Sequence, residues 1–147
     1  MKKVLIVLFC CLFGIGTAWS NEPDFVVTNG EVHFVESLRV SFLFGFSWNT
    51  DEGRVRLKAT EVDSYRKNGI VYYKVPVIVN GRETGRKQFM EAISMRNGQV
   101  VCRQLTAMRV GEKAELLNVY NVDRDNSYDL TITSKNVETL SQYFSRQ

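Results

Sequence analysis

The sequence predicts a mainly β protein, an antiparallel β-sandwich or partly open barrel of about seven to nine short strands. Four Asn-Gly pairs, several runs of alternating apolar and polar residues, and a content of only two prolines lead to this prediction. A two-residue hairpin loop needs positive φ at both central residues, which Asn tolerates and Gly adopts freely. Asn-Gly between alternating runs therefore predicts a tight hairpin. The four pairs are Asn29-Gly30, Asn68-Gly69, Asn80-Gly81 and Asn97-Gly98.

The first twenty residues have the layout of a secretory signal. Two lysines precede the uncharged, mostly apolar run 4–16, and small residues follow at the positions that a signal peptidase recognises. The apolar run is shorter than the roughly 18–20 residues that cross a bilayer. We therefore expect residues 1–20 to be removed on export. Residues 21–147 are expected to form a single β-rich domain, secreted or periplasmic, with no transmembrane segment after processing.

Period-two alternation predicts the strands of the N-terminal half. Strands 25–28 and 31–36 flank the first Asn-Gly pair, and a turn over 50–53 leads to a strand over 54–62. The longest alternating run is 39–49, in which five large apolar residues share one face: Val40, Phe42, Phe44, Phe46 and Trp48. Because large aromatic side chains dominate the core of a small domain, we expect one continuous strand here, with its phenylalanines at the centre of the core.

The C-terminal half alternates less regularly. Strands are predicted at the ranges 70–79, 82–90, 99–108 and 128–133, while 88–95 and 114–120 fit either a strand or a short helix. Pro76 cannot donate to a strand ladder, so its strand is expected to lie at an edge or to bulge there. Val137, Leu140 and Phe144 recur at helical spacing, which predicts a short C-terminal helix.

Cysteine content excludes an internal disulfide in the mature chain. Cys10 and Cys11 leave with the signal, and Cys102 remains alone. A free cysteine on a strand behaves as a small buried hydrophobe. The exported domain must therefore rely on its hydrophobic core for stability.

Charge is distributed unevenly along the mature chain. Loss of Lys2 and Lys3 leaves 17 basic residues against 16 acidic ones, a net charge of +1. Residues 21–53 carry −5, residues 54–113 carry +8 and residues 114–147 carry −2. The basic region could present a positive sheet surface to an anionic ligand, or simply a solvated outer face. Its candidate ligand-binding residues are Arg54, Arg56, Lys58, Arg82, Arg86 and Lys87.

The sequence holds little that points to catalysis. His33 is the only histidine, and a pair with Cys102 would need long-range geometry that the sequence does not show. No nucleophile-elbow, zinc or phosphate-loop pattern occurs. We therefore expect no enzyme, no catalytic residues and no cofactor.

One acidic segment resembles the start of a calcium loop. Asp123, Asp125 and Asp129 alternate with other residues, as oxygen ligands of calcium do. Tyr128 stands where the loop needs glycine, and Ser134 stands where a glutamate should close the site. The segment is therefore expected to be a polar turn without a metal.

These observations favour an exported, non-catalytic binding or accessory module. The leading hypothesis is that the module binds another protein, in envelope or surface-structure assembly or as an inhibitor of a foreign enzyme. The alternative is a binder of anionic glycan or lipid head groups through the basic region 54–113, and a second alternative is a hydrolase of unfamiliar type. Nucleic acid is not expected, because the chain is exported and no aromatic stacking motif lies among its basic residues.

Overall fold

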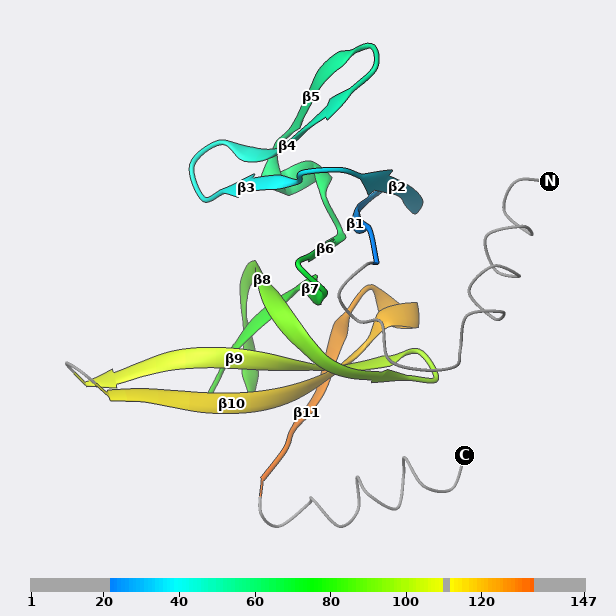
Figure 1. Cartoon of the computed structure of the whole chain (residues 1–147). Helices are drawn as coiled ribbons and strands as arrows, with labels where there is room; N and C mark the ends of the chain where they lie inside the picture. The colour runs from blue at the N-terminus through cyan, green and yellow to red at the C-terminus, as the bar shows by residue number, and fades with distance from the viewer. Residues whose placement is uncertain (1–21, 110–111, 134–147) are drawn as a thin grey trace.

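A computed structural model describes residues 22–109 and 112–133, which form eleven strands and two short 3-10 helices (Figure 1). These residues contain no α-helix, and every strand pairing is antiparallel. The prediction of a mainly β, antiparallel chain is confirmed, with more strands than the seven to nine expected. The predicted C-terminal helix lies outside the described residues.

Eight strands form one sheet in the order β11-β10-β9-β8-β7-β6-β1-β2. Both segments that fitted a strand or a helix, 88–95 and 114–120, lie in strands of this sheet. The bounds are β1 (Asp24–Thr28), β2 (Glu31–Val35), β6 (Ser64–Lys67), β7 (Ile70–Val79), β8 (Arg82–Arg96), β9 (Gln99–Arg109), β10 (Glu112–Asn121) and β11 (Ser127–Thr131).

The chain between β2 and β6 forms a separate three-stranded sheet in the order β3-β4-β5. Its strands are β3 (Arg39–Ser41), β4 (Gly45–Thr50) and β5 (Gly53–Leu57). The expected strand 54–62 thus ends early, and the 3-10 helix η1 (Ala59–Glu61) follows it. A second 3-10 helix, η2 (Val122–Arg124), connects β10 to β11.

All four Asn-Gly pairs form two-residue hairpin loops, as the sequence predicts. They connect β1 to β2, β6 to β7, β7 to β8 and β8 to β9. The four asparagines have φ between 48° and 52°, and the four glycines have φ between 72° and 79°. Positive φ at both central residues matches the right-handed twist of the flanking strands. These turns therefore fix the register of the large sheet.

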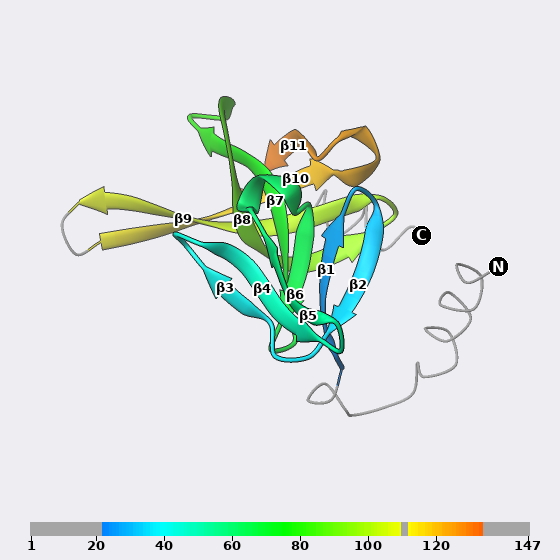
Figure 2. The same cartoon turned by 90° about the horizontal axis from the view of Figure 1, so that it is seen from above.

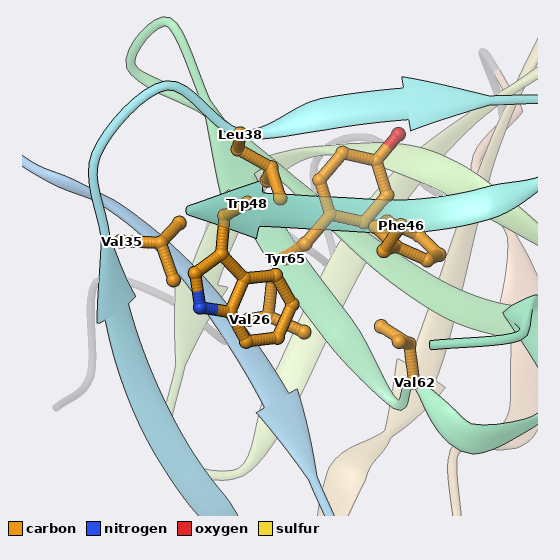
Figure 3. Packing of buried hydrophobic residues seen from close by; sticks show 7 residues of the cluster. All are labelled: Val26, Val35, Leu38, Phe46, Trp48, Val62 and Tyr65. Carbon is orange, nitrogen blue, oxygen red and sulfur yellow. The ribbon is translucent and has the colours of Figure 1, made fainter. Parts of the chain in front are cut away.

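A first hydrophobic cluster joins the three-stranded sheet to one end of the large sheet (Figure 3). The edge of the Phe46 ring contacts Tyr65 and Phe89, with ring centroids 4.9 Å and 5.3 Å apart. Tyr65 in turn stacks on Tyr72 at 4.7 Å. The buried members of the cluster are Val26, Val35, Leu38, Phe46, Trp48, Val62 and Tyr65.

A second cluster fills the other end of the large sheet, where the ladder between β7 and β8 is irregular at Pro76. Pro76 pairs with Lys87 and Ile78 pairs with Glu83, so the extra residues, 84–86, lie on β8. The irregularity was expected, but β7 is an interior strand and not an edge strand. The Gln104 side chain bonds the backbone of Ile78 as well: its amide oxygen accepts from the Ile78 N–H at 2.9 Å, and its amide nitrogen donates to the Ile78 carbonyl at 2.8 Å. The Tyr120 hydroxyl donates to the Pro76 carbonyl at 2.7 Å. The buried backbone at this irregularity is therefore hydrogen-bonded.

The expectation of one continuous strand over 39–49 is wrong. β3 ends at Ser41 and β4 begins at Gly45, so Phe42, Leu43 and Phe44 form a turn instead of a core stripe. Phe46 is buried as expected, as is Trp48, but Phe42 and Phe44 are exposed. The alternation breaks because the chain reverses over residues 42–44, and Gly45 completes this turn with a φ of +77°.

Candidate functional site

The turn between β3 and β4 exposes three consecutive large apolar side chains, here called the apolar tip. Phe42, Leu43 and Phe44 have relative exposures of 104 %, 83 % and 84 %, whereas the other large apolar residues whose side chains the structure describes reach at most 60 %. The turn lies at one end of the three-stranded sheet (Figure 1). The longer β9–β10 hairpin extends beyond it on the same side of the molecule (Figure 2). Turns are ordinarily built from polar residues or glycine, so this composition has no explanation in turn chemistry.

The backbone of the apolar tip is held by its two flanking residues. Ser41 and Gly45 pair across the base of the turn, and the Ser41 Oγ accepts a hydrogen bond from the Phe44 N–H at 3.3 Å. A Cβ on Gly45 would collide with the carbonyl oxygen of Leu57 on β5. The next pair along the hairpin joins Val40 to the buried Phe46. The turn is therefore anchored in the first cluster while its own side chains face outward.

Basic residues cover the outer face of the same three-stranded sheet. Arg39 pairs with Ser47, and Ser47 pairs with Arg56, so these side chains share the face opposite to the buried Phe46. Arg54 lies on this face too, and its guanidinium donates to the Ser47 Oγ at 3.0 Å. Lys58 follows at the end of β5. We call Arg39, Arg54, Arg56 and Lys58 the cationic face, and all four are exposed.

The charges of this sheet are unevenly placed along its length. Within residues 22–109 and 112–133, no residue of the cationic face forms an ion pair with a carboxylate. Arg39, Arg56 and Lys58 lie toward the tip, where the Glu61 carboxylate accepts from the backbone N–H of Lys58 at 2.7 Å. Asp51 and Glu52 lie in the β4–β5 turn at the opposite end, near Arg54, which pairs with Asn49. The end of the sheet at the tip is therefore the more positive one.

The six predicted ligand-binding residues fall into two groups. Arg54, Arg56 and Lys58 come together on the cationic face, whereas the other three lie on the outer half of the β7–β8 hairpin of the large sheet. Those three are Arg82, Arg86 and Lys87. The ammonium group of Lys87 lies 3.6 Å from the carboxylate of Asp125.

Two features of this surface escaped the sequence prediction. Arg39 belongs to an acidic stretch of sequence, and only the strand register places it in line with Arg56. The apolar tip lies in a run that alternates as a strand does, except at Leu43. Its available signals were Gly45 inside the run and Leu43 outside the alternation, because a glycine within a strand pattern often marks a bend or bulge.

The two candidate catalytic residues lie in different parts of the molecule. Cys102 is fully buried in the second cluster, and burial raises the pKa of its thiol from 9.0 to about 12. His33 lies on β2, with its ring centroid 6.4 Å from that of Trp48 in the first cluster. The two residues do not form the conceivable Cys102–His33 pair, and the thiol remains protonated at neutral pH.

The acids of the calcium-like segment contact protein groups. Asp125 adopts a left-handed φ of 55° and faces Lys87, and the Asp129 carboxylate accepts from the Gln99 side chain at 3.0 Å. The Asn126 side chain donates to the Lys74 carbonyl at 3.1 Å. In the part of the chain that the structure describes, no group of three or more His, Cys, Asp or Glu residues is arranged to hold a metal ion.

A shallow depression of about 450 Å³ lies where the β6–β7 turn meets β8 and β9. Ile70, Glu91, Ile93 and Arg103 contribute to its lining. The Arg103 guanidinium lies 3.3 Å from the Glu91 carboxylate and 2.7 Å from that of Glu115. Because these charges are already paired, the depression offers no free charged group to a ligand.

No protein-family model, curated protein or solved structure matches this chain. Among the described residues, no helix is both long enough and apolar enough to cross a membrane. The candidate site therefore rests on its own geometry, which combines an anchored apolar turn with an exposed cationic face on the same small sheet.

Proposed function

We propose that this protein is an exported, non-catalytic binding module that attaches to its target through the apolar tip and the cationic face. The exposure of Phe42, Leu43 and Phe44 carries this proposal. Contiguous exposed apolar groups on soluble proteins mark interaction sites, since they gain free energy only when a partner covers them. The N-terminal signal layout supports export to a compartment where the target lies.

The state of the candidate catalytic residues supports a binding role. A thiol with a pKa of about 12 is not a nucleophile at neutral pH, and the buried position of Cys102 keeps it from substrate. His33 is half-exposed beside Trp48, and its Nε2 lies 4.0 Å from the Glu31 carboxylate. Neither residue has the neighbours that a nucleophile or a general base requires.

A protein partner that adds a strand to β2 is the second candidate. β2 ends the order of the large sheet, and its Val32 and Phe34 are about half exposed on one face. An exposed apolar strand at a sheet edge can accept a strand from another chain. This arrangement suits assembly of an envelope or surface structure, or inhibition of a foreign enzyme.

Retention on immobilised native envelope material tests which surface binds. The tip variant carries Phe42→Ser, Leu43→Asn and Phe44→Ser, and Leu105→Thr is the matched control because Leu105 is an exposed apolar residue on β9. We expect the tip variant to lose retention and the control to keep it, both with native circular dichroism. Full retention of the tip variant would contradict the proposal. Selective loss in a Val32→Thr, Phe34→Thr variant would favour the strand-addition candidate instead.

A further inference from the structure

We infer that the target of this surface is an anionic lipid membrane. In this arrangement the apolar tip inserts at the boundary between head groups and acyl chains, and the cationic face contacts the phosphate groups. The inference rests on the proposed function, because it uses the same surface and specifies what that surface binds.

The spacing between the apolar tip and the cations matches the depth of a lipid interface. Arg39 lies two residues before the Ser41–Gly45 pair at the base of the turn. With a rise of about 3.4 Å per residue, Arg39 lies roughly 7 Å behind that base. Arg56 lies at the same level, because both arginines pair with Ser47. Lys58 is closer, because its Cα lies only 3.2 Å from where a Cβ on Gly45 would be. Apolar groups of interfacial proteins penetrate about 5–10 Å, so the cations would reach the head groups when the tip inserts.

Charge complementarity favours an anionic membrane over a neutral one. Among the residues that the structure describes, Arg39, Arg56 and Lys58 lie at the tip end of the sheet and form no ion pair, and the one carboxylate shown there, that of Glu61, accepts from the Lys58 backbone N–H. Asp51 and Glu52 lie at the opposite end. A negative surface would therefore attract the tip end and repel the far turn. The same field would orient the hairpin with its apolar side chains toward the lipid.

The size and shape of the surface favour a membrane over a protein partner. A specific protein interface usually buries more than about 1,000 Å² with good shape complementarity. The apolar tip is a turn of three exposed side chains, and charged residues begin immediately behind it. A bilayer accepts a small apolar wedge without a shaped pocket. Weak apolar insertion combined with basic residues is also a recognised two-part route to membrane attachment.

The backbone of the turn is suited to insertion. Unpaired backbone donors are costly in hydrocarbon, because no water is present to bond them. The Phe44 N–H is already bonded to the Ser41 Oγ, and Gly45 pairs with Ser41 across the base of the turn. One backbone donor of the turn therefore already has a partner when the tip enters the lipid interface.

Vesicle sedimentation of the mature chain tests the inference. The two probes are vesicles of pure phosphatidylcholine and vesicles that also contain phosphatidylglycerol, each at low and high salt. We expect binding to the anionic vesicles, weakening at high salt, and at least a tenfold loss of affinity in the tip variant. Arg56→Gln and Lys58→Gln should each weaken binding about fivefold. The matched control, Arg82→Gln with Arg86→Gln, should change binding less than twofold because these residues lie on the other sheet.

Fluorescence of a Phe44→Trp variant reports where the tip lies. Its emission should shift to shorter wavelength with anionic vesicles and should be quenched by lipids that carry a shallow acyl-chain quencher. A soluble sulfated polysaccharide would engage only the cationic face and should leave the emission unshifted. Unshifted emission with anionic vesicles, or equal binding to both vesicle types at all salt concentrations, would overturn the inference.

Different results would contradict the lipid target and the binding role of the apolar tip. If vesicles are not bound but retention on native envelope still depends on the apolar tip and is lost after protease treatment, the target is a protein. That result overturns the lipid inference and leaves the proposed function standing. If vesicles are bound equally well by the wild type and by the tip variant, the tip is not the attachment site and both are overturned.

Discussion

The Asn-Gly turns of the large sheet and the β3–β4 turn of the small sheet differ in what their side chains do. The four Asn-Gly turns of the large sheet place a small polar residue and a glycine at positive φ, where backbone geometry requires them. In the β3–β4 turn of the three-stranded sheet, Ser41 and Gly45 hold the backbone, and the loop between them consists of Phe-Leu-Phe. The backbone geometry of the fold requires the residues of the Asn-Gly turns. It does not require large apolar residues in the β3–β4 turn.

The glycines of these turns are restricted in different ways. A Cβ at Gly30 or Gly81 would meet nothing within 4 Å, so these turns are limited by φ alone. Gly45 is limited both by φ and by contact with β5. The apolar tip therefore stands on a rigid base, which lowers the entropy lost when its side chains are buried by a partner.

The largest expected effect comes from the first buried aromatic behind the tip. Phe46 is 2 % exposed and contacts Tyr65 and Phe89, so Phe46→Ala should destabilise the domain by about 3–5 kcal/mol. Chemical denaturation followed by tryptophan fluorescence measures this change. A loss below about 1 kcal/mol would show that the three-stranded sheet does not depend on the first cluster, and that the base of the tip is not rigid.

The next largest effect on stability should come from replacing the turn glycine by alanine, and it should differ between the β3–β4 turn and an Asn-Gly turn. Gly45→Ala should cost more than about 2 kcal/mol, since it combines left-handed strain with collision against the Leu57 carbonyl. The matched change Gly81→Ala meets only the strain at a φ of +72° and should cost about 1 kcal/mol. Equal losses in denaturation experiments on the two variants would mean that the contact between Gly45 and β5 is not important.

Alkaline pH should lower the free energy of unfolding by less than Phe46→Ala or Gly45→Ala does. Burial raises the pKa of Cys102 from 9.0 to about 12 and that of Tyr65 from 10.0 to about 12. Both groups keep their protons in the folded state after the unfolded chain has lost them, so stability is complete below pH 9 and falls as pH rises toward 12. Between pH 8 and pH 10, Cys102 alone should lower the free energy of unfolding by about 1.5 kcal/mol.

Urea denaturation at pH 8, 9 and 10 measures that decline. Cys102→Ala should make it shallower, after allowance for the small cavity that the variant creates. In the wild type at pH 8, the thiol should react with a disulfide reagent only as fast as the domain opens. Immediate reaction would show that Cys102 is accessible.

Local chemistry explains which parts of the fold the sequence predicts. Asn80-Gly81 specifies its turn within two residues, and Pro76 indicates an irregular ladder because it lacks an N–H. The bonding of the Ile78 backbone by Gln104, 26 residues away, depends on the strand order and has no local signature. Beyond the irregular register at Pro76 the buried residue is Ile78, whereas Val79, four residues after Val75 and so on the same face by simple alternation, is 48 % exposed.

The candidate site was only partly predictable for the same reason. Arg54 and Arg56 alternate on one strand, so their common face follows from sequence. Arg39 joins them only through the pairing of β3 with β4. The alternation over 39–49 fits equally a core strand and a hairpin with an apolar turn, and the difference lies in the conformation of Gly45.

The smallest expected effect on stability is the most informative one. Phe44 is 84 % exposed, so Phe44→Ala should change the free energy of unfolding by less than about 0.5 kcal/mol, against several kcal/mol for Phe46→Ala two residues away. The same variant should bind anionic vesicles more weakly. Denaturation and vesicle sedimentation on a single preparation give both values.

A result in which Phe44→Ala costs more than about 1.5 kcal/mol would mean that the turn packs against the domain, and the docking proposal would then fail.

A related expectation concerns the unfolded chain, in which the uncharged run 40–46 is prone to β aggregation. Phe44→Ser should therefore refold with less aggregation than the wild type, because it interrupts this run with a polar residue. Light scattering during refolding measures that difference. Unchanged folded stability, improved refolding and weaker membrane binding in one variant would together show that the tip is retained for its contacts outside the domain.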